Sequence, residues 1–258
     1  MTLIVTTISD LGILQGSDSN LTRTTTAGVA TPAGEGQKVF RLDFCHAALA
    51  IAGSYEIAGV RMDTWMSSTA RDFSSSSSPS LEGFARYLQE RLSVDGTPGK
   101  TALLIHIAGY VTDARGSHPE MWFVRNFAGM DPTTGAYIDR TDDFLISEDF
   151  WNRDYPDDVR IGRGSLPGYG RRYFNGIPEG RISFSAISQM LEGFLGGVWA
   201  APGWAFRAPR DVAEASLFMR LESNVIGTLF EVSDYAAPFV GGRAQIELIP
   251  APSDALPL

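Results

Sequence analysis

The spacing of apolar residues changes along the chain in blocks, and the order of these blocks is the strongest constraint on the fold. The first block, up to Gly53, contains short β-branched and apolar runs typical of strands, beginning with TLIVTT. Residues 55–73 contain no proline and predict a helix, and a second helical spacing follows Pro79. Strand patterns return, two more helical spacings follow, and AQIELI predicts a last strand. The order is therefore strands, two helices, strands, two helices and a strand.

Each predicted helix has a local signal. Ser54 is predicted to cap the first one. The other three carry apolar residues three or four positions apart, namely Leu81, Phe84, Leu88 and Leu92, then Ile187, Met190, Leu191, Phe194 and Leu195, then Leu217, Leu221, Val225 and Leu229. Residues 74–78 are serines and predict a flexible link, and residues 129–181 predict an elaborated, irregular insertion. We expect one α+β domain over residues 1–258, a four-layer αββα sandwich with two antiparallel sheets between helical layers.

Charge and cysteine content exclude several classes of function. The 258 residues contain 21 Lys+Arg and 30 Asp+Glu, so the net charge of -9 disfavours binding to nucleic acid or anionic membranes. The single cysteine, Cys45, cannot form an internal disulfide, which suits a reducing compartment. No apolar run of about 18 residues and no signal-peptide pattern is present in the sequence. We therefore expect a cytoplasmic location.

Metal and nucleotide sites are not indicated. The histidines have no spacing that would build a zinc site, and the acidic cluster at 139–143 lacks the spacing of a calcium loop. The segment GTPGKT resembles a phosphate loop, but Val94 stands in place of its first glycine. We expect no metal and no cofactor.

Thr2 is the first candidate for catalysis. Its side chain is small enough for methionine aminopeptidase to remove Met1, which would unite a hydroxyl and a free α-amine in one residue. An α-amino group titrates at about pH 8, so part of it is unprotonated at neutral pH and can accept the hydroxyl proton. Threonine is also common at the second position, so Thr2 alone indicates little.

Three further residues stand where such a nucleophile would need partners. Asp18 follows the second predicted strand, Lys38 opens the segment KVFRL, and Gly53 closes AIAG. With Thr2, this set resembles the proteasome β-subunit family of N-terminal-nucleophile hydrolases, including its simpler bacterial homologues. The resemblance extends over roughly residues 2–110.

The resemblance implies a role for each of these residues. Thr2 Oγ attacks a carbonyl while the α-amine of Thr2 serves as general base. Lys38, held by Asp18, places a positive charge near the hydroxyl, and the backbone N–H of Gly53 faces the oxyanion. Taken by themselves, Lys38 and Asp18 could equally form a structural ion pair, and Gly53 could be a turn glycine.

The resemblance also implies a substrate pocket. The family lines its pocket from the start of the first helix, which implies Ile51, Tyr55 and Gly59 in this sequence, and Thr22 matches the family's threonine after the aspartate. Specificity for an apolar side chain is expected.

Three positions depart from the family pattern. Residues 238–240 are Pro-Phe-Val, where the family has an aspartate and a hydroxyl residue before a glycine pair. Arg163 stands where a serine is expected if IGRGS is the family's G-S-G-S-like segment, and Asn20 replaces a common arginine. These departures keep open a non-catalytic scaffold or binding protein, and a threonine-dependent ligase or transpeptidase is a third alternative.

The resemblance thus favours an N-terminal threonine amidohydrolase, a peptidase acting on peptides or unfolded proteins. It also implies a homo-oligomeric ring. The chain carries no ATP-binding motif of its own, so any ATPase unfoldase would be a separate protein.

Overall fold

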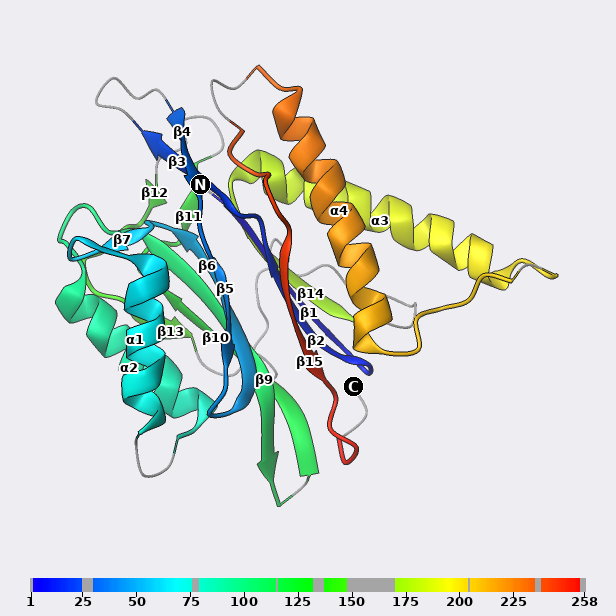
Figure 1. Ribbon diagram of the computed structural model, residues 1–258, viewed down its shortest axis with the longest axis horizontal. Helices are drawn as coiled ribbons and strands as arrows, with labels where there is room; N and C mark the ends of the chain where they lie inside the picture. Colours follow the sequence, from blue (N-terminus) through cyan, green and yellow to red (C-terminus); the bar gives the residue numbers. More distant parts are fainter. Residues whose placement is uncertain are drawn as a thin grey trace.

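The computed structural model describes residues 2–24, 30–75, 79–114, 116–131, 137–147, 170–203, 205–234 and 238–255. Within these residues the chain forms several antiparallel sheets and four helices, in the order that the apolar spacing predicted (Figure 1). The α+β class is confirmed.

The N-terminal hairpin forms the centre of the first sheet. β1 (Leu3–Ser9) pairs antiparallel with β2 (Gly12–Ser17), and β14 (Arg171–Gly176) and β15 (Gln245–Pro250) complete the order β14-β1-β2-β15. Every residue of β1 and β2 is buried. Their residues are buried on both sides because both faces of this sheet are covered.

The second sheet has the strand order β13-β10-β9-β6-β5. Its strands are β5 (Val39–Leu42), β6 (His46–Gly53), β9 (Leu103–Asp113), β10 (Gly116–Arg125) and β13 (Leu145–Ser147). Three small hairpins lie outside the two sheets, formed by β3 (Asn20–Thr24) with β4 (Ala30–Glu35), β7 (Glu56–Ile57) with β8 (Val60–Arg61), and β11 (Gly129–Met130) with β12 (Tyr137–Ile138).

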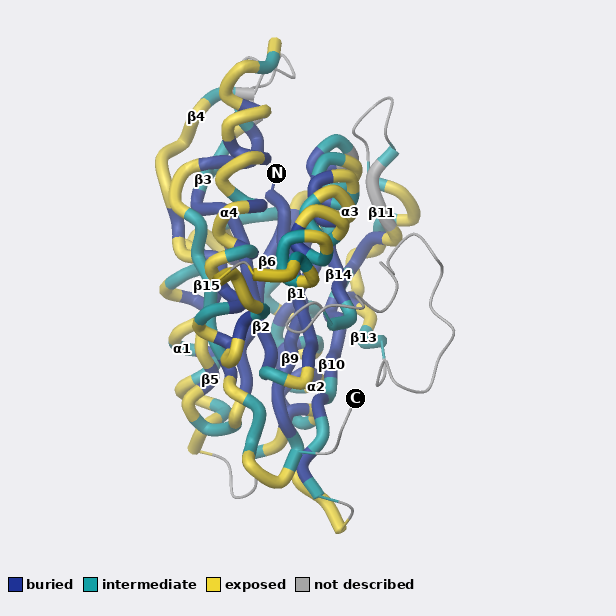
Figure 2. The backbone as a smooth tube through the Cα atoms, turned by 90° about the vertical axis from the view of Figure 1, so that its right-hand side faces the viewer, coloured by how far each residue is buried: buried dark blue, intermediate teal, exposed yellow. Residues whose placement is uncertain are grey.

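The helices cover the outer faces of the sheets in pairs. α1 (Met62–Ser74) and α2 (Leu81–Asp95) pack on the second sheet, and α3 (Pro178–Ala200) and α4 (Val212–Glu231) pack on the first (Figure 1). The inner faces of the two sheets meet in two further apolar clusters. Figure 2 shows the buried strands running through the middle of the molecule, with exposed residues on the helices.

A buried ion pair links β14 to the helices that cover it. Arg172 Nη1 lies 2.7 Å from Glu222 Oε1 of α4, and both side chains are almost fully buried. Ser188 of α3 also contacts Glu222 Oε1, at 3.1 Å. The pair therefore joins one strand and two helices.

The first helix begins later than predicted. It starts at Met62, after the β7–β8 hairpin, in which Ala58 (φ 51°) and Gly59 (φ 79°) form a tight turn with left-handed backbone. Ser54 does not cap it, because Ser54 Oγ accepts a hydrogen bond from Ala102 N at 2.9 Å. Residues 55–61 lack a proline but form a hairpin, so the prediction of a helix from residue 55 was wrong.

The predicted irregular insertion was too wide. Residues 129–181 include the regular strand β14 and the first turn of α3, which begins with proline at its first position. Residues 148–169 lie outside the described residues, as do most of the predicted serine link and Arg163.

In the described part of the chain, no helix is long and apolar enough to cross a membrane.

Candidate functional site

Thr2 lies directly before β1, and its side chain is buried. Its carbonyl oxygen accepts a hydrogen bond from Ile177 N at 3.3 Å, where β14 leads into α3. A Cβ on Gly176 would lie 2.0 Å from Thr2 O, so this close approach of two backbones requires glycine. The backbone of Thr2 is therefore held between β1 and the start of α3.

Lys38 brings its ammonium group to the Thr2 hydroxyl. Lys38 Nζ lies 2.6 Å from Thr2 Oγ1 and 3.1 Å from Asp18 Oδ2, and it also donates to the carbonyl oxygen of Asn20. Asp18 follows β2, and its other carboxylate oxygen accepts a hydrogen bond from Leu3 N at 3.2 Å. Three residues predicted from the sequence, separated by 16 to 36 positions, thus form one hydrogen-bonded cluster.

Burial dominates the electrostatics of this cluster. Asp18 is 5% exposed and Lys38 is 2% exposed. Burial raises the pKa of the Asp18 carboxyl and lowers the pKa of the Lys38 ammonium, while the attraction between the two groups opposes both shifts. A lysine with a lowered pKa releases its proton more readily than an exposed one. Lys38 can therefore stabilise an alkoxide when charged, or accept the hydroxyl proton when neutral.

A glutamine that the sequence analysis missed fixes the backbone that carries Lys38. Gln245 Oε1, from β15, accepts hydrogen bonds from Lys38 N at 2.7 Å and Val39 N at 3.3 Å. Its amide nitrogen donates to Gly36 O at 2.7 Å. No local sequence signal identifies this residue, because it lies more than 200 positions from its partners.

Gly53 lies at the end of β6 and lines the same cavity as Thr2. Its φ of 116° and the carbonyl oxygen of Ala102, which a Cβ would approach to 2.1 Å, both require glycine here. The assignment of its N–H to an oxyanion stays a prediction.

Three of the residues predicted to bind substrate do not line this cavity, and their role in binding stays a prediction. Ile51 is buried in the core beneath α1 and α2, because alternate residues of β6 face opposite sides of the sheet and Ala52 faces the cavity. Gly59 is exposed at the β7–β8 turn, and Thr22 lies in β3. None of the three lines the cavity beside Thr2.

Tyr55, the fourth residue predicted to bind substrate, contacts the segment that precedes Lys38. Its hydroxyl lies 2.9 Å from Gln37 O and 3.1 Å from Asp63 Oδ2, and its ring packs on Gly36. The pKa of Tyr55 is raised to about 12, mainly by burial and then by Asp63. Tyr55 therefore connects α1 to the chain just before Lys38.

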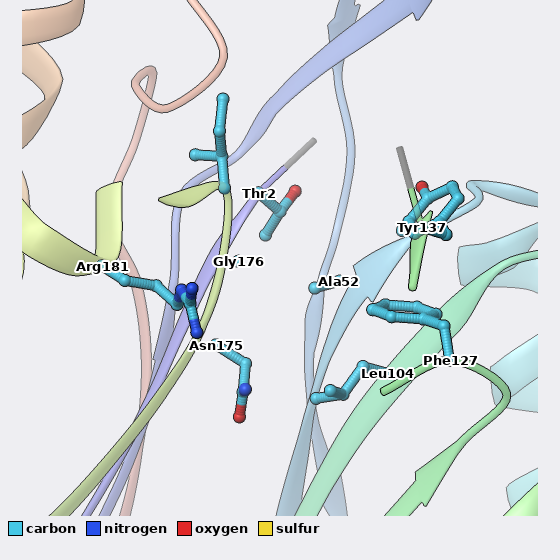
Figure 3. Close-up of a pocket in the computed structure, with 10 residues that line it drawn as sticks. Thr2, Ala52, Leu104, Phe127, Tyr137, Asn175, Gly176 and Arg181 are labelled. Carbon is cyan, nitrogen blue, oxygen red and sulfur yellow. The ribbon is translucent and has the colours of Figure 1, made fainter. Parts of the chain in front are cut away.

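The cavity beside Thr2 lies between the two sheets, where the end of β14 faces the end of β6 and the start of β9 (Figure 3). It is lined by Thr2, Ala52, Gly53, Leu104, Phe127, Tyr137, Asn175, Gly176, Ile177 and Arg181. Figure 3 shows Arg181 and Asn175 on one side, Phe127, Leu104 and Tyr137 on the other, and Thr2 between the two sides. Of these lining residues, Thr2 and Gly53 were predicted from the sequence. The others were not, because they come from segments after residue 100 or from the inward positions of strands.

A buried histidine holds Asn175. His106 Nε2 lies 2.7 Å from Asn175 Oδ1, and its Nδ1 lies 2.9 Å from Thr6 Oγ1. Burial lowers the pKa of His106 to about 4, so the ring is neutral at pH 7. The ring of His106 therefore joins Thr6 of β1 to Asn175 of β14.

The remaining residues that could form a metal or catalytic site do not form one within the described part of the chain. No group of three metal-ligating side chains is found there. Burial raises the pKa of Cys45 to about 12, so its thiol is a poor nucleophile. Phe239 and Val240 are buried in the core, so no hydroxyl stands before Gly241.

Comparisons with known proteins concern the fold. No protein-family model matches the sequence, and no curated protein matches it. A solved structure of a mutant of Anbu from Hyphomicrobium sp. strain MC1 is similar, with a TM-score of 0.50 and 13% identity over 97% of this chain and 82% of that chain. Anbu is a bacterial proteasome-like protein, and the likeness supports a distant, proteasome-like relation in fold.

Proposed function

We propose that this protein is an N-terminal threonine amidohydrolase with a single domain of the four-layer αββα class. The observation that carries the proposal is the contact of 2.6 Å between Lys38 Nζ and Thr2 Oγ1, backed by Asp18. An ion pair that only stabilised the fold would not need Lys38 to contact the Thr2 hydroxyl. A hydroxyl held against a buried lysine is the arrangement expected of an activated nucleophile.

The proposed reaction starts when removal of Met1 frees the α-amine of Thr2. The amine, directly or through a water, takes the hydroxyl proton while Thr2 Oγ attacks an amide carbonyl. Lys38 stabilises the developing alkoxide and, when charged, lowers the pKa of the amine by repulsion. The backbone N–H of Gly53 is proposed to bind the oxyanion. The leaving amine takes the proton, and water then hydrolyses the ester on Thr2.

The test is the intact mass of untagged protein before and after an epoxyketone that reacts with both the hydroxyl and the amine of an N-terminal threonine. We expect loss of Met1 and one covalent adduct. Thr2→Ala should form no adduct, whereas Thr64→Ala, at an exposed threonine of α1, should react like the native protein. Retention of Met1, or an adduct that persists in Thr2→Ala, would contradict the proposal.

The absence of a hydroxyl before Gly241 favours the second candidate, a non-catalytic scaffold or binding protein. That candidate predicts no adduct in the same experiment. If the adduct forms, product analysis with an added amine separates hydrolysis from transfer of the acyl group to that amine, as in a ligase or transpeptidase.

We also propose a homo-oligomeric assembly through α3 and α4. Leu217, Leu221, Val225 and Leu229 form an exposed apolar stripe along α4, and Met190 and Phe194 of α3 are more than 60% exposed. The buried side of α4 uses a different set that includes Met219 and Ile226. Apolar surface of this extent on neighbouring helices is typical of a protein interface.

Leu221→Glu should reduce the mass of the assembly in solution, because it places a charge in the centre of the proposed interface. The measurement is light scattering after size-exclusion chromatography. Val94→Glu, at an 80% exposed position of α2, is the matched control and should leave the mass unchanged. An unchanged mass in Leu221→Glu would show that this face is not the interface.

A ring of this kind is proposed to act in the cytoplasm on peptides or on chains unfolded by a separate ATPase.

A further inference from the structure

The cavity beside Thr2 combines a cationic wall with an apolar one. One wall has Asn175 at the end of β14 and Arg181 in the first turn of α3. Phe127, Leu104 and Tyr137 face them from the second-sheet side (Figure 3). A cavity with these two walls suits a small molecule that has an anionic end and an apolar side chain.

Arg181 has no carboxylate partner among the described residues. Its Nε is buried and makes no hydrogen bond there, although its backbone N–H donates to Ile177 O as part of α3. Arginine stays charged, and its planar guanidinium binds carboxylates through two parallel hydrogen bonds. An arginine that is partly buried in a cavity, and that has no carboxylate partner in the described part of the chain, is therefore available to an anionic ligand.

Asn175 lines the same side of the cavity as Arg181. His106 Nε2 lies 2.7 Å from Asn175 Oδ1 and holds this side chain in place. The other polar atom of the Asn175 amide makes no hydrogen bond to a described residue. His106 is thus a positioning residue for a polar side chain in the cavity.

We propose that the cavity selects a short peptide or N-acyl amino acid whose C-terminal residue is aromatic or aliphatic and carries a free carboxylate. Arg181 binds the carboxylate, and Phe127, Leu104 and Tyr137 contact the side chain. This inference rests on the proposed function for the reaction that follows. Thr2 Oγ forms an ester with the acyl carbon as the amide C–N bond breaks. The hydroxyl proton passes to the leaving amino acid, and water then releases the acyl group as an acid.

Binding tests the inference without any turnover. We expect 3-phenylpropanoate, which has no N-acyl bond for Thr2 to cleave, to bind the native protein in calorimetric titration about tenfold or more tightly than 3-phenylpropanamide, which lacks the charge. Arg181→Met should remove this preference by weakening the acid and not the amide. Arg86→Met, at an exposed arginine paired with Glu82, is the matched control and should keep it.

The outcomes separate this inference from the proposed function. Equal affinity for acid and amide, or no binding of either, would overturn the carboxylate site even if Thr2 reacts with the epoxyketone. Preferential binding of the acid together with an inert Thr2 would support the site and reject the amidohydrolase. Because the acid and amide are compared on the native protein, the test holds even if Arg181→Met fails to fold.

Discussion

The double variant Lys38→Met/Asp18→Asn is expected to remain folded and to form the epoxyketone adduct on Thr2 about 10²- to 10⁴-fold more slowly than the native protein, the range that a positioned proton-transfer group contributes. Methionine keeps the length of the lysine stem but cannot stabilise an alkoxide or accept a proton. Asparagine keeps an oxygen that can accept the hydrogen bond from Leu3 N. The measurement is the rate of adduct formation with the epoxyketone, followed by intact mass.

Each single variant should behave differently from the double variant. Lys38→Met leaves Asp18 as a buried carboxylate without its ammonium partner, and Asp18→Asn leaves Lys38 without its carboxylate. Breaking a buried pair in this way typically lowers the free energy of unfolding by about 3–5 kcal/mol, whereas removing both charges costs less. Urea unfolding of the singles and the double therefore gives a coupling energy for the pair.

Lys100→Met, at an exposed lysine, is the control and should change neither rate nor stability. A double variant that reacts with the epoxyketone at the native rate would show that the Lys38–Asp18 pair is structural only. The cluster would then be an ion pair that happens to touch the Thr2 hydroxyl.

Glu222→Leu is expected to lower the free energy of unfolding by about 3–5 kcal/mol, because it removes the negative charge opposite buried Arg172. It also removes an acceptor from Ser188 Oγ. The effect should appear as a lower midpoint in urea unfolding with little change in slope.

The double variant Arg172→Met/Glu222→Leu should recover much of this loss, since both buried charges are then absent. Glu82→Gln, in the half-exposed Arg86–Glu82 pair of α2, is the matched control and should have little effect. If Glu222→Leu is as stable as the control, the buried pair does not contribute to joining β14 with α4.

The order of elements could be predicted because each carries a local signal. β1 begins with an apolar and β-branched run, and α2 and α4 follow the N-cap residues Ser80 and Asp211, whose side chains accept hydrogen bonds from the first turn. The start of α1 could not be predicted, since the positive φ of Ala58 arises in a turn that the sequence marks only by Gly59.

Which face of α4 is exposed could not be predicted from the sequence. Leu217, Leu221, Val225 and Leu229 have the spacing of a buried helix face, but the structure exposes them and buries another face of α4. Periodicity identifies the helix without telling which neighbour covers which face. The face of α4 with Met219 and Ile226 is buried because it packs against the first sheet.

By itself, the sequence determined the α+β class, the order of strands and helices, and the three residues Thr2, Asp18 and Lys38, because these depend on local periodicity and on the resemblance of short segments. Only the tertiary structure decided what surrounds Thr2. Asn175 and Arg181 reach the cavity because β14 pairs with β1, and Ala52 rather than Ile51 faces it because side chains alternate along β6. Contacts between segments more than 100 residues apart depend on strand pairing and side-chain direction, and no local pattern encodes either.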